Sequence, residues 1–301
     1  MHYKWSPLPS RKPLRWPNGK RLAVILTVNL EHWEMIKESK EPHYAGGPPI
    51  ILDPVPANIA DFPNFSWREY GQRAGVWRCF DVIGKSGVQA TATMNALTAL
   101  KRPEIVQTAV DMGFEMVAHG WEQGELLHKL SPDVDKQRKL IREVLAVYEK
   151  AVGKKAKGWL SSSLRGTPEA IDICAEEGLT FYCDLMNDDQ PYLIETPSGP
   201  IVSVPYVVEI NDFSLFSRRG LTTSQGLDEI KEQFDVLYAE SAETGKLMNL
   251  GVHPHVIGQP FRIRALREFI EHAKKHDGVW FATREEIAAW YLKNHESHIP
   301  R

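Results

Sequence analysis

The stretch with the clearest chemical potential is VAHGWEQGELL, residues 117–127, in which a histidine closes a short apolar run. Gln123 follows His119 by four residues, and a second histidine at that spacing would put two imidazoles on one helical turn, where both could bind a metal. Glutamine is a poor metal ligand, so the spacing is that of a metal site with one ligand replaced. A histidine at this place can also be a buried, hydrogen-bonded structural group. The residues alone leave both interpretations open.

Two further segments carry groups that could transfer protons. TVNLEHWE, residues 27–34, places Glu31 and Glu34 after an apolar strand, where a carboxylate can act as general base or as metal ligand. The same acids could instead favour the positive end of a helix. LGVHPHVIGQPFR, residues 250–262, supplies His253 and His255, and Pro254 between them predicts that the strand ends there, so we expect one of the two to face a site.

Other polar clusters are less informative. Ser161–Ser163 lack the G-x-S-x-G turn of a serine hydrolase, and NDDQPY, residues 187–192, lacks the ligand spacing of a calcium loop. No glycine-rich phosphate-binding motif follows the first strand. The remaining histidines lie in helical or terminal polar contexts, and we expect them to be solvated; they include His2, His272, His276 and His298.

The elements that must position these residues follow a repeat, in which an amphipathic segment leads through a glycine to a short apolar run. Alternation of this kind predicts parallel βαβ units, beginning with the strand KRLAVILTVNL at residues 20–30. Several polar residues lie at or just after the end of a predicted strand, and in a barrel such ends meet on one face; they are Glu31, His119, Ser161–Ser163, Asp184, Glu209 and His253. Two Pro- and Gly-rich segments, residues 35–75 and 185–200, are predicted to be long functional loops. We expect one domain over residues 1–301.

Composition limits the partners. The 301 residues carry a net charge of −3 without a basic tract, which argues against nucleic acid and a membrane surface as partners. The sequence has no apolar run of membrane-spanning length and no amino-terminal apolar segment typical of a signal peptide. Three cysteines without a C-x-x-C spacing fit a reduced, cytoplasmic protein. We therefore expect a cytoplasmic protein that meets a small-molecule substrate.

Taken in order, these motifs resemble the polysaccharide deacetylase superfamily, with its chitooligosaccharide deacetylase homology fold. The resemblance spans residues 15–295 and is closest to a subgroup of allantoinase-like proteins, cyclic-imide hydrolases and intracellular peptidoglycan-deacetylase-like proteins. Besides HGW at residues 119–121, it rests on WREYGQRAGVWR, FYCDLMNDDQPY, VPYVVEINDF, HPHVIGQPFR and GVWFATREEIAAWY. Where the family has an Asp-x-Asp pair, this sequence has Asn29-Leu30-Glu31, and where the family has His-x-x-x-His it has His119 and Gln123. GWLSSSLRGT also departs from the family's third motif.

The resemblance implies an α/β fold, a distorted and incomplete (β/α)7 barrel of TIM type, and a hydrolase of carbon–nitrogen bonds other than peptide bonds. It implies Glu31, His119 and His253 as catalytic residues, and it makes Arg73, Trp121, Gln123, Arg165 and Glu209 candidates for substrate binding. No cofactor is favoured; a divalent metal such as zinc would be held by Glu31 and His119. A homo-oligomer, dimer or tetramer, is expected. The preferred substrate is a small cyclic amide, imide or ureide, and the alternatives are N-deacetylation of an acetylated sugar or peptidoglycan fragment and an inactive barrel that acts as a binding protein.

Overall fold

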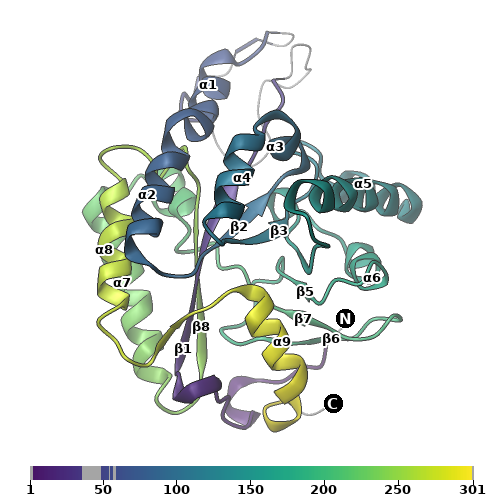
Figure 1. Ribbon diagram of the computed structural model, residues 1–301, viewed down its shortest axis with the longest axis vertical. Helices are drawn as coiled ribbons and strands as arrows, with labels where there is room; N and C mark the ends of the chain where they lie inside the picture. Colours follow the sequence, from purple (N-terminus) through teal and green to yellow (C-terminus); the bar gives the residue numbers. More distant parts are fainter. Residues whose placement is uncertain (1–2, 36–48, 54, 57–58, 300–301) are drawn as a thin grey trace.

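A single nine-stranded sheet curls through the protein (Figure 1). The computed structural model describes residues 3–35, 49–53, 55–56 and 59–299. Within these residues the strands are hydrogen-bonded in the order β6-β7-β5-β4-β3-β2-β1-β8, with β9 paired to β1. All pairs are parallel except β6–β7. The strands are β1 Leu22–Leu30, β2 Thr91–Met94, β3 Glu115–Ala118, β4 Gly158–Trp159, β5 Phe181–Tyr182, β6 Tyr192–Ile194, β7 Ile201–Ser203, β8 Lys246–Val252 and β9 Val279–Phe281.

Helices follow most strands and cover the outside of the curled sheet (Figure 1). The α-helices are α1 Phe62–Tyr70, α2 Val76–Ser86, α3 Ala96–Lys101, α4 Pro103–Asp111, α5 Val134–Val152, α6 Pro168–Glu176, α7 Thr223–Glu240, α8 Ile263–Ala273 and α9 Arg284–Asn294. Two π-helical turns, η3 Gly71–Gly75 and η6 Phe213–Arg218, and five 3-10 turns complete the described elements. The 3-10 turns are η1 Leu8–Ser10, η2 Pro17–Gly19, η4 Leu127–Lys129, η5 Ser162–Leu164 and η7 His295–Ser297. The predicted fold, a distorted and incomplete (β/α)7 barrel, is confirmed.

Strand β1 is buried on both faces of the sheet. Its nine residues are all buried, and alternate residues belong to different layers of the core. Leu22, Val24 and Leu26 pack with residues of the surrounding helices, whereas Ala23 and Ile25 pack with the second cluster, which includes Tyr291 of α9. A strand buried on both faces reads as a continuous apolar run, as LAVILTVNL does.

Local signals in the sequence set several helix ends. Pro103 and Pro168 occupy the first turns of α4 and α6, where the missing N–H costs nothing. Gly153 ends α5 with a φ of 77°, a left-handed conformation that glycine adopts without strain. The buried face of α5 includes Ile141, Val144 and Tyr148, as its apolar spacing predicts.

The two predicted loops need correction. Residues 62–75 are helical, since Asp61 accepts a hydrogen bond from the Asn64 N–H and starts α1, which runs through η3 into α2. Within residues 185–200, β6 pairs with β7 as a short antiparallel hairpin. Part of the first predicted loop, and His2, lie outside the described residues. In the part of the chain that the structure describes, no helix is both long and apolar enough to cross a membrane.

Candidate active site

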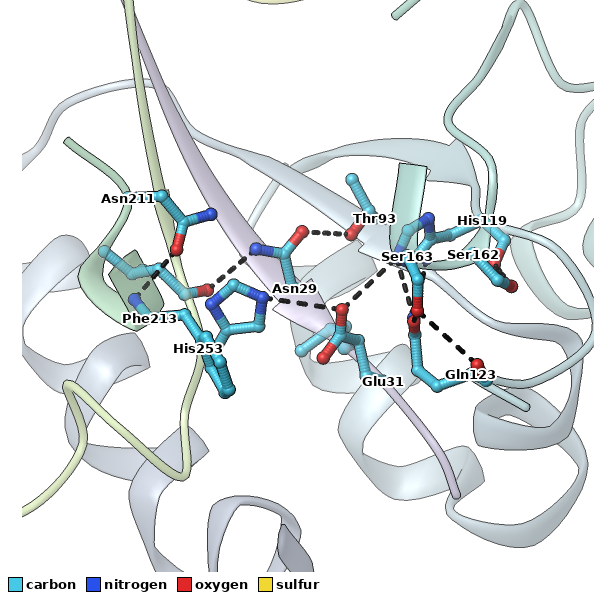
Figure 2. Close-up of polar contacts among 12 residues, drawn as sticks. Asn29, Glu31, Thr93, His119, Gln123, Ser162, Ser163, Asn211, Phe213 and His253 are labelled. Carbon is cyan, nitrogen blue, oxygen red and sulfur yellow. Dashed lines mark hydrogen bonds and ion pairs between the residues drawn. The ribbon is translucent and has the colours of Figure 1, made fainter. Parts of the chain in front are cut away.

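Glu31 lies between two histidines (Figure 2). Its Oε1 is 3.3 Å from Nε2 of His119 and 3.5 Å from Nε2 of His253. Glu31 directly follows β1, His119 follows β3, and His253 follows β8, so three parallel strands deliver the side chains to one edge of the sheet. The Glu31 residue is 8% exposed and the His253 side chain 12%, whereas His119 is 2% exposed, so solvent reaches the carboxylate and His253 more easily than it reaches His119.

Asp212 hydrogen-bonds Nδ1 of His253, on the side of the ring away from Glu31. The Asp212 carboxylate accepts a hydrogen bond from Nδ1 of His253 at 2.7 Å, and its second oxygen accepts the backbone N–H groups of His253 and Ile257 at 2.7 and 3.1 Å. Burial disfavours the imidazolium, but the carboxylates of Glu31 and Asp212 outweigh that effect and raise the pKa of His253 to about 10. His253 is therefore a cation at neutral pH, and its Nε2 proton points toward Glu31.

The charge of His253 also determines the state of Glu31. Burial alone would raise the pKa of the Glu31 carboxyl. The positive charge of His253 and its hydrogen bond to the carboxylate outweigh burial, and the pKa of Glu31 lies well below its usual range. In the resting site, Glu31 is an ionised carboxylate paired with an imidazolium.

His119 is fixed in one tautomer by its neighbours. Its Nδ1 is 2.9 Å from the carbonyl oxygen of Leu160, which can only accept, so the proton is on Nδ1. Ser163 donates its backbone N–H to Oε1 of Gln123 at 3.0 Å and its hydroxyl to the same oxygen at 2.9 Å, which turns the amide nitrogen of Gln123 toward His119. That nitrogen is 2.8 Å from Nε2 of His119, so the lone pair of His119 accepts a hydrogen bond from Gln123.

Asn29 belongs to the framework of the site. Its amide nitrogen donates to the Tyr206 hydroxyl at 2.9 Å and to the Val252 carbonyl at 3.2 Å, and its oxygen accepts from Thr93 at 2.8 Å. The side chain is 2% exposed. Asn29 ties β1 to β2 and β8 just before the residue that carries the carboxylate.

These contacts bear on whether the residues fit a metal ion. A catalytic zinc takes three protein ligands and a water. Asn29 uses both of its polar atoms within the protein, the Gln123 oxygen is engaged by Ser163, and the lone pair of His119 faces an amide N–H. Glu31 and His119 remain as the only potential ligands from the two predicted motifs, and one of them has its donor atom in use. This donor set does not fit a closed transition-metal site.

Several predicted substrate-binding residues form no hydrogen bond or ion pair with the catalytic side chains in the part of the chain that the structure describes. Arg73, Arg165 and Glu209 are exposed, and none of them is among the hydrogen bonds and ion pairs found for Glu31, His119 and His253. Trp121 is half-buried and packs against the core. Of the five predicted residues, all within the described part of the chain, Gln123 alone hydrogen-bonds a predicted catalytic residue. For Arg73, Trp121, Arg165 and Glu209, a place in substrate binding stays a prediction.

Three other groups near the site are structural in their contacts. Gln72, one residue before Arg73, donates to the Glu31 carbonyl at 2.8 Å. Asp184 accepts from the Ser161 N–H and the Tyr182 hydroxyl, both at 2.7 Å, and burial raises the pKa of its carboxyl. His255, two residues after His253, is buried edge-on against Trp33 and Trp67, and burial holds the pKa of its imidazole well below its usual value.

Asp212 is the important residue that the sequence prediction missed. It lies at the start of η6, within VPYVVEINDF, rather than at a strand end. Nothing in its local sequence marks it as the partner of a histidine 41 residues later. The only signal was its membership of a segment already associated with the site.

Known proteins with this architecture were found by sequence and by structure. A Schizosaccharomyces pombe protein named as a polysaccharide deacetylase is 30% identical over 306 residues, covering 93% of each chain. A crystal structure from Pseudomonas aeruginosa, described as a polysaccharide deacetylase, superposes with a TM-score of 0.83 at 30% identity, over 95% of this chain and 94% of the other. The Puue allantoinase superposes with a TM-score of 0.83 at 29% identity, with the same coverage. No family model matches the sequence.

The fold and these relatives define the class of protein, a hydrolase of carbon–nitrogen bonds other than peptide bonds built on an incomplete barrel. Within that class, the chain belongs to the polysaccharide deacetylase family, and the structural similarity includes the allantoinase-like branch. Membership of this family makes a divalent metal a plausible cofactor.

Proposed function

We propose that the protein opens a small cyclic amide, imide or ureide by hydrolysis, without a metal ion. The observation that carries the proposal is the placement of the Glu31 carboxylate between His119 and a His253 imidazolium backed by Asp212. A base and an acid 3.5 Å apart suit a reaction in which water attacks a carbonyl while the neighbouring nitrogen is protonated. The similarity to the Puue allantoinase over nearly the whole chain supports a ring as substrate.

The roles follow from the protonation states. Water and substrate entering the site would separate Glu31 from His253 and weaken the attraction that holds the pKa of Glu31 low, so the carboxylate becomes a better base as the site fills. Glu31 then takes a proton from the attacking water, and the hydroxide oxygen bonds to the carbonyl carbon. His253 gives its Nε2 proton to the ring nitrogen as the C–N bond breaks.

The resting state is restored by one proton transfer. After ring opening, Glu31 carries the proton of the water and His253 is neutral. Because the two side chains face each other, that proton can pass back from Glu31 to His253 once product leaves. His119, whose Nδ1–H donates to the Leu160 carbonyl and whose Nε2 accepts from Gln123, orients the attacking water beside Glu31 without itself giving up a proton.

A second candidate is N-deacetylation of an acetylated sugar or peptidoglycan fragment. It is favoured by the Schizosaccharomyces pombe and Pseudomonas aeruginosa relatives, which are named for polysaccharide deacetylation. The reaction is also an amide hydrolysis, and the same base and acid would serve it.

We also infer that the protein works in the cytoplasm and forms a homo-oligomer. Gel filtration with light scattering tests the oligomeric state.

The test is a substrate panel assayed with and without chelator. The purified protein is incubated with allantoin, hydantoin, succinimide, glutarimide and an N-acetylglucosamine oligomer, and Glu31→Gln is run beside it in every arm. Ring opening that survives chelator and is lost in Glu31→Gln supports the proposal. Release of acetate alone would favour the second candidate, and chelator-sensitive turnover would refute the metal-free mechanism. No turnover in any arm would favour the inactive binding barrel.

A further inference from the structure

Two histidines and an aspartate meet on the outer helical layer, away from the active site. They are His272 near the end of α8, His276 just beyond it, and Asp235 on the neighbouring helix α7. One ligand atom from each lies within 4.8 Å of the others, and among the described residues no other His, Cys, Asp or Glu cluster meets that criterion. The predicted solvation of His272 and His276 is therefore incomplete, since both are half-buried.

The cluster is far from the catalytic centre. His276 lies three residues before Val279, the first residue of β9, and Val279 pairs with Leu22, the first residue of β1. Glu31 follows the other end of β1, and nine residues of strand span roughly 27 Å or more at about 3.3 Å per residue. Figure 1 shows α7 and α8 side by side along one flank of the sheet. The cluster thus lies near the end of the sheet opposite to His253.

Hydrogen bonds hold both histidine rings of the cluster in place. Nδ1 of His276 is 3.1 Å from the backbone carbonyl oxygen of His272, which can only accept, so the proton is on Nδ1 and the lone pair is on Nε2. A backbone carbonyl behind a histidine is the usual outer contact of a metal-binding imidazole. Nε2 of His272 is 2.7 Å from Oδ1 of Asp235. A ring nitrogen of His276 lies within 4.8 Å of both a ring nitrogen of His272 and a carboxylate oxygen of Asp235.

Aromatic packing limits how far the rings can turn. Phe234 packs edge-on against both His272 and His276, with centroids 5.3 and 5.0 Å apart. Tyr238 packs edge-on against His276 at 4.7 Å. Phe234 is fully buried, so this wall is fixed by the core between α7 and α8. The two histidines therefore have little side-chain entropy left to lose when they bind an ion.

We propose that Asp235, His272 and His276 form a binding site for a divalent transition-metal ion such as Zn²⁺, which clamps α7 to α8. Two imidazoles and one carboxylate, with water in the fourth position, are a ligand set that Zn²⁺ accepts. The ion takes the place of the proton that lies between Nε2 of His272 and Asp235. His272 then carries its one remaining proton on Nδ1, and its Nε2 lone pair binds the ion. This proposal does not depend on the metal-free mechanism, because the two sites share no residue.

The test is a Zn²⁺ titration of the full chain after chelator treatment and desalting, with a metallochromic competitor to report affinity. We expect one ion per chain, and affinity at least about tenfold weaker in His272→Gln and in His276→Gln, since even outer contacts of a metal site contribute tenfold or more. His295→Gln, a histidine substitution on another helical segment, should bind as the parent does. His119→Gln separates this site from the catalytic centre and should also leave the titration unchanged.

Co²⁺ absorption spectra and thermal unfolding test the proposal even if one of the variants folds poorly. Co²⁺ bound by these three residues should give visible absorption bands in the parent that are absent in His276→Gln, and Zn²⁺ should raise the thermal unfolding midpoint of the parent but not that of His276→Gln. Mg²⁺, which prefers oxygen ligands, should do neither. Equal Zn²⁺ affinity in the parent, His272→Gln and His276→Gln, or loss of the ion in His119→Gln alone, would overturn the proposal.

Discussion

The amide nitrogen of Gln123 is 2.8 Å from Nε2 of His119 and donates a hydrogen bond into the lone pair that would otherwise bind a metal. The Ser163 N–H fixes this orientation by holding the Gln123 oxygen. Gln123 therefore does more than omit a ligand, because it also occupies the donor atom of the histidine that remains. Replacing it tests the idea that the metal site has been lost from this barrel.

Gln123→His should raise metal affinity without a matching gain in rate. A second imidazole four residues after His119 restores a ligand and removes the amide that blocks the first. The rate should not follow, because Glu31 already accepts the proton of the water in the proposed mechanism. Zn²⁺ titration and turnover are measured in a His272→Gln background, so that the helical cluster does not contribute. A parallel rise in rate and affinity would contradict the metal-free mechanism.

Glu31→Gln should lower turnover by about 10² to 10⁴, the range for loss of a general base or acid. The substitution keeps the size of the side chain but cannot accept the proton. Glu34→Gln is the matched control, since Glu34 is half-exposed and its contacts are with His32 and Lys101. Circular dichroism should show both variants folded. Activity of Glu31→Gln within tenfold of the parent would mean that another group is the base, and Asp184 would be tested next.

Asp212→Asn should shift the alkaline limb of the pH profile of kcat/KM. The profile of the parent should fall as pH rises toward about 10, because His253 must be protonated to act as acid and its pKa is raised to about 10. Removing one of the two carboxylates should move that limb down by about one to three pH units. A profile that keeps its alkaline limb in place while kcat falls would show that Asp212 only supports the turn.

The interaction of His253 with Asp212 also predicts how the free energy of unfolding changes with pH. A histidine whose pKa is raised on folding stabilises the protein fully below its unfolded pKa, near 6.5, and the contribution is lost as pH rises through the folded value of about 10. The difference in unfolding free energy between the parent and Asp212→Asn should therefore be largest below pH 6.5 and shrink toward pH 10. Urea denaturation at a series of pH values measures it, and a difference that grows with pH would be the wrong sign.

Gly75→Ala should destabilise the protein and disturb His253 together. A Cβ at Gly75 would lie 1.9 Å from the carbonyl oxygen of Pro254, the residue after His253. Overpacking of this kind costs about 1–3 kcal/mol. Gly84→Ala, in the adjoining helix, meets only the flexible end of Met112 at 3.1 Å and serves as control. Thermal unfolding and kcat are the measurements; a Gly75→Ala variant as stable and active as Gly84→Ala would show that the turn gives way freely.

The parts of the fold that were predictable are those set by local sequence. The continuous apolar run of residues predicts β1, and a proline predicts the start of α4 and of α6. None of these predictions requires knowledge of which elements pack against them. The meeting of Glu31 and His253 was predictable because parallel strands deliver their ends to one edge.

The errors have tertiary causes. The helical run from α1 through η3 looked like a loop because of its glycines, and Gly71 and Gly75 are there for close approach to the turn after His253. His298 is 1% exposed rather than solvated, since Tyr291 and Gln190 hydrogen-bond its two nitrogens. Asp212 was missed because its role depends on His253, which follows β8 and lies 41 residues later in the sequence. None of these contacts leaves a periodic signal in the sequence.

The pairing of β1 has a consequence for how the protein is made. β1 leaves the ribosome long before its partners β8 and β9, so the nascent chain carries a long apolar strand with an unpaired edge until those strands are made. Glu31 is translated long before His253, so the catalytic pair forms only after β8 has been made. Folding of the enzyme should therefore depend on chaperones that bind the nascent chain. Truncation before β8 should yield aggregation-prone chains rather than a smaller barrel.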